Sequence, residues 1–143
     1  METFLSRLGI PDNEKSELVS LFSNKELGAG DVLFEHDDVA EVLFFLLEGN
    51  LAVHKYTGFL EKMQVIALLD PGTVVGEAAL LDGHIRKTRV IAIKNSKLAC
   101  LNKNEFEDFR KKYPQSGFSF LKYLFSTIAL RLEKTSERLA RIL

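Results

Sequence analysis

Residues 75–90 read VGEAALLDGHIRKTRV, and this stretch decides how the rest of the chain is interpreted. Gly76 lacks a Cβ, so a ligand can approach the backbone closely, and the Ala-Ala-Leu-Leu run after Glu77 favours a short helix. The first turn of such a helix offers free N–H groups and a positive dipole end, which bind anions such as phosphate. Glu77 can accept hydrogen bonds from sugar hydroxyls, and Arg86 can return on a strand to hold the phosphate through two hydrogen bonds.

Around this stretch, from residue 28 to residue 102, β-branched and aromatic residues come in short runs. Turn signals such as Gly49-Asn50 and Asp70-Pro71-Gly72 separate the runs. Many short strands at such spacing predict an antiparallel barrel or jelly roll. The candidate strands are Val32–Phe34, Val42–Leu47, Leu51–Tyr56, Met63–Leu69, Arg86–Ile93 and Leu98–Leu101.

Both ends of the chain have helical spacing. Within residues 1–27, leucines recur at intervals of three and four, and Pro11 marks the start of a second short helix. After residue 102 we expect a short helix near Lys103–Lys112, a break at Pro114 and a long helix from about Gly117 to the end. The prediction is one α+β, mainly β domain over residues 1–143: N-terminal helices 1–27, β-barrel 28–102 and C-terminal helices 103–143.

The long helix has an unbroken heptad pattern. Its apolar or small residues at alternating gaps of three and four are Phe118, Leu121, Phe125, Ile128, Leu132, Thr135, Leu139 and Ile142. A seam this regular favours an identical partner, so we expect a homodimer through a parallel coiled coil over residues 118–142. The alternative is that the stripe packs on the barrel of its own chain.

Composition excludes several classes of protein. The 143 residues suffice for one domain, and 46% hydrophobic with 27% charged residues is ordinary for a globular chain. The net charge of −1 gives no general attraction to nucleic acid, and a single cysteine excludes a disulfide framework or a multi-cysteine zinc site. The longest apolar run, Val42–Leu47, is too short for a bilayer, so we expect a cytoplasmic protein that does not insert into membranes.

Taken together, Phe34–Gly49, the turn at 70–72 and the run Gly76–Arg86 resemble the cyclic-nucleotide-binding domain of the catabolite activator protein (CRP/FNR-like) superfamily. The resemblance extends to about Leu139. It implies that the phosphate-binding cassette of that family is residues 75–90 here, and that no cofactor is needed beyond the nucleotide ligand.

The resemblance also implies a role for individual residues. The Glu77 position binds the ribose 2′-hydroxyl, the Arg86 position binds the cyclic phosphate, and backbone N–H groups matching Ala78 and Ala79 help to hold that phosphate. The ligand-binding residues that we expect are Val75, Gly76, Glu77, Ala78, Ala79, Arg86, Lys87, Thr88, Thr135 and Ser136.

In the long helix, the run from Arg131 to Glu137 is similar to the dimer helix of the same family, where a Thr-Ser pair meets the adenine ring of cyclic AMP. Thr135 falls on the heptad seam, where an apolar residue would pack better, so capping a base across the dimer axis would explain it. This favours cyclic AMP over cyclic GMP. The alternative is a hydroxyl bonded to the carbonyl four residues earlier.

Two departures from the family pattern concern the ligand. Lys87-Thr88-Arg89 stands where the family has a small or hydroxyl residue, then Ala, then Ser or Thr. Strand alternation would place Thr88 beside Arg86, with Lys87 and Arg89 on the other face. Either Thr88 supplies the missing hydroxyl, or the pocket holds a more anionic ligand. Asp37 replaces a family glycine, and Asp tolerates a left-handed backbone.

Other classes of function have less support. A cupin-type metal enzyme needs clustered ligands, but His36, His54 and His84 stand apart in the sequence, and Cys100 lies in an apolar strand rather than a reactive setting. The chain ends at Leu143 within the predicted helix, so we expect no DNA-binding domain.

We therefore expect a sensor that is not an enzyme, binds a cyclic nucleotide and signals to an unidentified protein partner. The alternative is a degenerate domain that keeps the fold and the dimer without the ligand.

Overall fold

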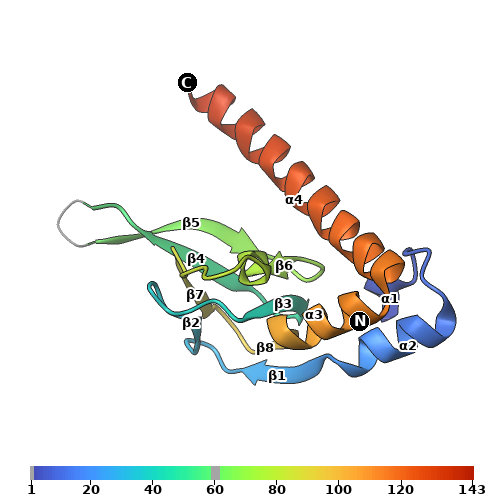
Figure 1. Cartoon of the computed structure of the whole chain (residues 1–143). Helices are drawn as coiled ribbons and strands as arrows, with labels where there is room; N and C mark the ends of the chain where they lie inside the picture. Colours follow the sequence, from blue (N-terminus) through green and yellow to red (C-terminus); the bar gives the residue numbers. More distant parts are fainter. Residues whose placement is uncertain (1, 59–61) are drawn as a thin grey trace.

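The computed structural model describes residues 2–58 and 62–143, which form a β-sandwich with the four α-helices gathered on one side of it (Figure 1). The helices are α1 (Glu2–Leu5), α2 (Asp12–Ser20), α3 (Lys103–Lys112) and α4 (Pro114–Ile142), with a 3₁₀ turn η1 (Glu77–Leu80). The strands are β1 (Ser23–Leu27), β2 (Val32–Phe34), β3 (Val42–Glu48), β4 (Leu51–Tyr56), β5 (Met63–Leu69), β6 (Val74–Val75), β7 (Arg89–Ala92) and β8 (Ser96–Asn102).

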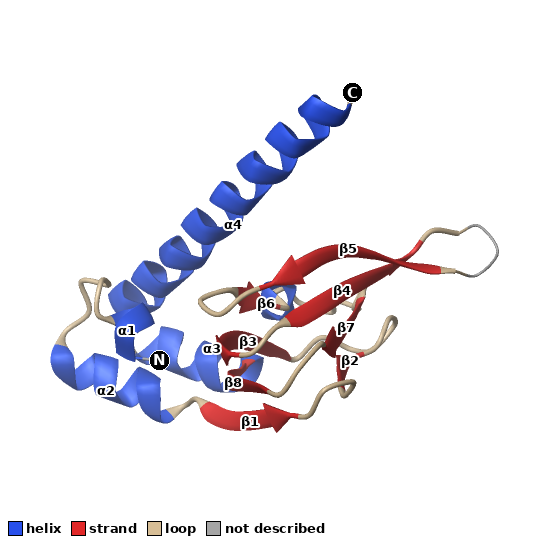
Figure 2. Ribbon diagram, turned by 180° about the vertical axis from the view of Figure 1, so that it is seen from behind, coloured by secondary structure: helices blue, strands red, loops and turns tan. Residues whose placement is uncertain are grey.

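The strands form two antiparallel sheets of four, in the orders β1-β8-β3-β6 and β2-β7-β4-β5 (Figure 2). The two sheets make the jelly roll that the run spacing predicts, so the predicted fold class is confirmed. Among the described residues, no helix is long and apolar enough to cross a bilayer.

Strand β3 joins the two halves of the core. Its sequence VLFFLLE is apolar on both faces, as a strand that is covered on both sides requires. Leu43 and Phe45 belong to a cluster shared with the helices, where the rings of Phe106 and Phe120 lie 5.1 Å apart. Phe44 and Leu46 belong to the cluster between the two sheets. The second sheet, β2-β7-β4-β5, and the helices therefore pack on opposite faces of β3.

The prediction of helices throughout residues 1–27 is wrong at its end. Helix α2 stops at Ser20, and Ser23–Leu27 is a strand whose residues pair with β8 from Ser23↔Cys100 to Leu27↔Ser96. Only Leu27 of this strand is buried, so its sequence has no alternating apolar signal. Pairing with the edge of β8 decides its conformation, and the barrel begins at residue 23 rather than 28.

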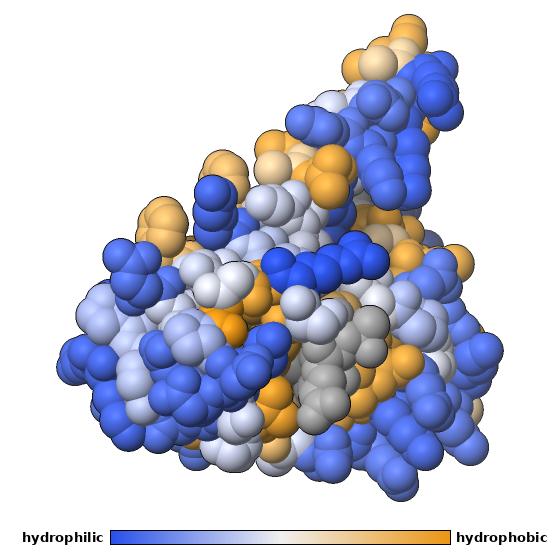
Figure 3. Space-filling view, turned by 90° about the vertical axis from the view of Figure 1, so that its right-hand side faces the viewer, coloured by the Kyte–Doolittle hydropathy of each residue, from blue (hydrophilic) through white to orange (hydrophobic). Residues whose placement is uncertain are grey.

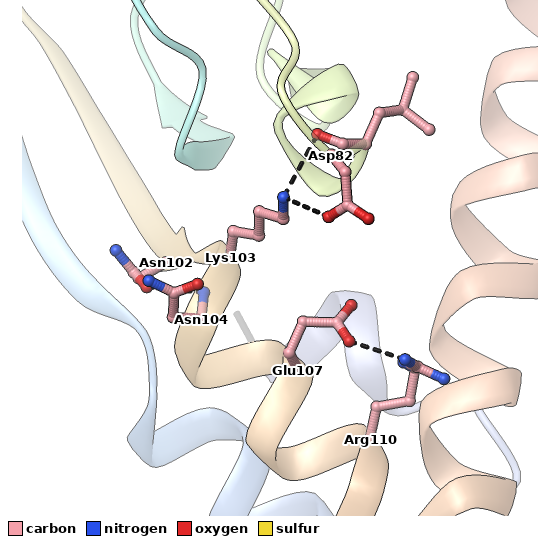
Figure 4. A network of polar contacts seen from close by, with 7 residues as sticks. Asp82, Asn102, Lys103, Asn104, Glu107 and Arg110 are labelled. Carbon is pink, nitrogen blue, oxygen red and sulfur yellow. Dashed lines mark hydrogen bonds and ion pairs between the residues drawn. The ribbon is translucent and has the colours of Figure 1, made fainter.

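Helix α3 begins at a polar cap, and its first residue also contacts the predicted cassette. The Asn102 side chain accepts hydrogen bonds from the N–H groups of Asn104 and Glu105, at 2.8 and 3.3 Å. The next residue, Lys103, pairs with Asp82 at 2.6 Å and donates to the Leu81 carbonyl at 3.5 Å (Figure 4). The segment after η1 is therefore tied to the start of α3.

Helix α4 begins at Pro114, three residues before the predicted Gly117, because proline suits the first turn of a helix. Its buried residues, Ser116, Gly117, Phe120 and Leu124, all lie in the first part of the helix. The rest extends away from the sandwich, and both orange apolar and blue polar side chains lie along this projecting arm (Figures 1 and 3).

Most of the heptad seam is exposed on this helix. Phe118 is 64% exposed, Phe125 72%, Leu132 65% and Ile142 81%. These four seam side chains therefore have little cover within their own chain, whereas Leu121 and Ile128 are only 36% exposed.

Candidate ligand-binding site

A cavity of about 270 Å³ opens between the second sheet, the cassette and α4. Apolar residues make up more than half of its lining, together with a few charged and polar ones, as is usual for small-molecule sites. The residues that line it are Phe34, Val53, Ala67, Leu69, Val74, Val75, Gly76, Glu77, Ala78, His84, Arg86, Lys87, Thr88, Val90 and Arg131. Seven of the ten predicted ligand-binding residues are among them; Ala79, Thr135 and Ser136 are not.

Arg86 is a buried cation in this cavity, with only 5% of its surface exposed. Its guanidinium donates to the carbonyls of Gly76, at 3.0 Å, and Val42, and lies 4.1 Å from the centre of the Phe34 ring. Burial lowers the pKa of Arg86, while the negative charges of Glu77 and Asp38 act in the opposite direction. None of the described carboxylates forms an ion pair with it. A buried cation in this state favours an anion beside it.

The backbone around Arg86 is held by the turn at Asp37. The Arg86 N–H donates to the Asp38 carbonyl at 2.8 Å, and the Asp37 N–H donates to the Arg86 carbonyl at 2.9 Å. Asp37 has φ of 75°, the left-handed conformation in which glycine is usual. Asp37 therefore keeps the turn that the sequence departure put in question.

Gly76 is required for two reasons. Its φ is 69°, and a Cβ at this position would lie 2.6 Å from Nη1 of Arg86. Any other residue would be strained in this conformation, and its Cβ would displace the guanidinium. The group that approaches the Gly76 backbone in this chain is Arg86, and the close approach of a ligand at Gly76 stays a prediction.

The two alanines of η1 differ from one another. Ala78 lines the cavity, but Ala79 is fully buried and its N–H donates to the Gly76 carbonyl at 3.1 Å. The expected short helix is a single 3₁₀ turn, and the i→i+3 bond of that turn uses the Ala79 donor. The structure thus does not bring Ala79 to the cavity.

Glu77 pairs with a residue of α4. Its Oε1 lies 3.2 Å from Nη1 of Arg131, and Nη2 of Arg131 donates to the Val74 carbonyl at 2.6 Å. Sequence reasoning did not select Arg131 as a site residue, because it lies 54 positions from Glu77. One signal was available: Arg131 lies one helical turn before Thr135, on the same face.

Lys87 and Thr88 both line the cavity with Arg86. The expectation that Lys87 faces away, together with Arg89, is wrong for Lys87. Strand β7 begins only at Arg89, so residues 86–88 do not alternate as a strand would. Arg89 lies elsewhere and pairs with Glu35 at 2.9 Å.

Thr135 and Ser136 are exposed on α4 and stand outside the cavity of their own chain. The Thr135 hydroxyl donates to the Arg131 carbonyl at 2.9 Å, which is the local bond that offered the alternative explanation for a polar residue on the seam. Contact of Thr135 or Ser136 with a base requires a second chain, and it stays a prediction.

Groups that would indicate other chemistry lie apart. No cluster of three His, Cys, Asp or Glu side chains suited to a metal occurs within residues 2–58 and 62–143. Cys100 is half-buried, and burial raises the pKa of its thiol. Of the histidines, His84 lies at the cavity, while His36 contacts Asp37 at 3.1 Å.

The jelly roll, the long helix and a cavity built around a buried arginine define a β-sandwich module with a candidate ligand site. Residues 24–113 match the family model of the cyclic nucleotide-binding domain. The chain belongs to this family.

Solved structures of similar fold agree with the family match. A cyclic nucleotide-binding domain from Methylobacillus flagellatus KT superimposes with a TM-score of 0.88 over 99% of this chain and 81% of that chain, at 19% identity. The catabolite activator protein of Thermus thermophilus superimposes with a TM-score of 0.74 over 94% of this chain and 61% of that chain, at 22% identity.

Curated relatives are longer proteins. The cyclic AMP receptor protein of Thermus thermophilus is 24% identical over 106 residues, which are 74% of this chain and 49% of that protein. Glutaminase 2 of Bradyrhizobium diazoefficiens is 29% identical over 122 residues, which are 84% of this chain and 18% of that protein. The chain thus spans half or less of their length. The fold is typically non-catalytic, although some relatives are parts of enzymes.

Proposed function

We propose that this domain binds a cyclic nucleotide, with cyclic AMP favoured, and performs no chemistry on it. The observation that carries the proposal is Arg86, a buried guanidinium without a carboxylate partner among the described residues, in the same cavity as Glu77. An anionic phosphate at Arg86 would supply the missing counter-charge through charge-assisted hydrogen bonds. Glu77 would accept from the ribose hydroxyl.

Binding would reach the rest of the molecule through α4. Arg131 belongs to α4, lines the cavity and bonds to both Glu77 and Val74. Because an ionised carboxylate has two acceptor oxygens, Glu77 can keep Arg131 on one and receive the ribose on the other. A ligand that repositions Glu77 would then move the anchor of α4 and favour one arrangement of the helix.

The output of that movement is proposed to be a homodimer and an unidentified downstream protein. The exposed seam of α4 supports a second copy as the partner, since the seven apolar side chains at seam positions are 36–81% exposed in a single chain. In the dimer, Thr135 and Ser136 of one copy would reach the base bound by the other. We expect this domain to act in the cytoplasm, and none of its described residues suggests that it binds DNA or inserts into a membrane.

Calorimetry with cyclic AMP and cyclic GMP tests the proposal on wild type and Arg86→Ala. Loss of the phosphate contact should cost about 1.5–3 kcal/mol of binding free energy, the range for hydrogen bonds to charged groups. Because Arg86 also bonds to Gly76 and Val42, Arg86→Lys and circular dichroism should accompany it to separate lost binding from lost folding. Arg89→Ala, which removes an arginine outside the cavity, is the matched control and should bind normally.

A degenerate domain that keeps the fold as an interaction module is the second candidate. It is favoured by the contacts already made in this chain, because Glu77 is paired with Arg131 and Arg86 bonds to two carbonyls. Wild-type protein that gives no heat with either nucleotide at millimolar concentration would make this the better description.

A further inference from the structure

The cavity holds more positive charge than a cyclic nucleotide neutralises. Three of its lining residues are cations, Arg86, Lys87 and Arg131, and its lining contains one carboxylate, Glu77. Glu77 is paired with Arg131. Arg86 and Lys87 are left as neighbouring cations, and neither forms an ion pair with a described residue.

The local backbone brings these two consecutive side chains to one cavity. In a regular strand, neighbours point to opposite faces, but β7 begins at Arg89, and residues 86–88 before it are outside any strand. Arg86 is buried and Lys87 is exposed, and both are lining residues of the cavity. Thr88 adds a hydroxyl to the same lining. One phosphate could therefore contact a guanidinium, an ammonium and a hydroxyl together.

The charge of the phosphate distinguishes possible ligands. The phosphodiester of a cyclic nucleotide carries one negative charge, which Arg86 alone can meet. A phosphate monoester carries about −1.5 to −2 at neutral pH and has three acceptor oxygens. We infer that the site also accepts a nucleoside monophosphate with an open phosphate, the product of hydrolysing the cyclic ring, and that Lys87 holds the second charge. This rests on the proposed function, since the sugar would use Glu77 in both cases.

The size of the cavity agrees with a ligand of this class. Its volume of about 270 Å³ lies just below the range for ligand pockets, roughly 300–1,000 Å³. That space suits one nucleotide rather than a dinucleotide, so the extra positive charge is better explained by a second charge on one phosphate than by a second phosphate group.

Calorimetry with cyclic AMP, 3′-AMP and 5′-AMP on wild type, Lys87→Gln and Lys94→Gln tests the inference. Lys94 is an exposed lysine outside the cavity lining, so its variant removes the same charge elsewhere. In wild type we expect at least one monophosphate to bind within tenfold of cyclic AMP. Lys87→Gln should lower the affinity for that monophosphate about tenfold, as expected for one charged hydrogen bond, and should change the affinity for cyclic AMP much less. Lys94→Gln should change neither.

The outcomes separate this inference from the proposed function. Binding of cyclic AMP without either monophosphate, or an equal loss for all ligands in Lys87→Gln, would overturn the inference and leave the proposed function standing. Binding of no nucleotide would overturn both. Binding of a monophosphate without cyclic AMP would support the role of Lys87 and overturn the preference for the cyclic ligand.

Discussion

At the scale of single residues, the site depends on how Gly76 and Arg86 fit together. Gly76 accepts a hydrogen bond from Arg86 through its carbonyl, and its missing side chain leaves the space that the guanidinium fills. Arg86 in turn lies over Phe34 and has no counter-ion among the described residues. The Gly76 carbonyl and the Phe34 ring therefore hold the buried guanidinium without a carboxylate partner, which leaves its charge available to an anion.

Gly76→Ala should therefore lower both stability and ligand affinity. The left-handed backbone costs an L-residue about 1–2 kcal/mol, and the new Cβ would lie 2.6 Å from Nη1 of Arg86 and displace it. Gly83→Ala is a close control, because Gly83 has φ of 65° and nothing within 4 Å of a Cβ. Thermal unfolding should report a similar loss from strain in both variants. Calorimetry with cyclic AMP should show weakened binding in Gly76→Ala only, and equal affinities in the two variants would contradict this account.

At the scale of elements, a strand can be predicted from the sequence only where its own residues show a pattern of apolar residues and turn signals. Strand β4 lies at its predicted bounds, Leu51–Tyr56, because an apolar run follows a Gly-Asn turn signal. Strand β1 shows four exposed residues and one buried leucine, so nothing in its own residues indicates a strand. Strand β6 has two residues, which pair with Phe44 and Phe45 and are too few for any periodicity. The conformation of both strands is decided by pairing with strands distant in the sequence, β8 for β1 and β3 for β6.

The same distinction holds within the site. Glu77 and Arg86 can be found from the sequence because nine positions of one segment separate them. The contribution of Arg131 depends on how α4 crosses the cassette, which no local spacing encodes. The presence of Lys87 in the cavity lining depends on where β7 begins, since strand alternation from residue 86 would have separated it from Arg86.

Arg131→Met tests whether α4 is coupled to the cavity through this side chain. The methionine keeps an apolar stem but removes the bonds to Glu77 and Val74. The ion pair is partly exposed, so its loss should cost no more than about 1 kcal/mol of stability. Hydrogen exchange around residue 131 should respond to cyclic AMP in wild type and lose that response in Arg131→Met. Arg138→Met, further along the exposed part of α4, should keep the response; a retained response in both variants would rule out this route.

At the scale of the whole molecule, α4 divides into a part that serves the chain itself and a part that faces outward. Phe120 and Leu124 are buried in the core of the chain, whereas the neighbouring Phe118 and Phe125 are exposed. A monomer would leave most of the surface of Leu132, Leu139 and Ile142 in water as well. With a net charge of −1, this chain has little electrostatic repulsion to keep two copies apart.

Phe125→Glu should separate the proposed dimer without unfolding the domain, because Phe125 is 72% exposed and absent from the buried core. A carboxylate facing its own copy across the seam brings like charges together in an apolar contact. Ser126→Glu introduces the same charge one position away, off the heptad pattern, and should leave the dimer intact. Sedimentation velocity at tens of micromolar should give a dimer for wild type and Ser126→Glu and a monomer for Phe125→Glu. A monomeric wild type would end the dimer proposal, and with it the expectation that Thr135 and Ser136 meet the base of a second copy.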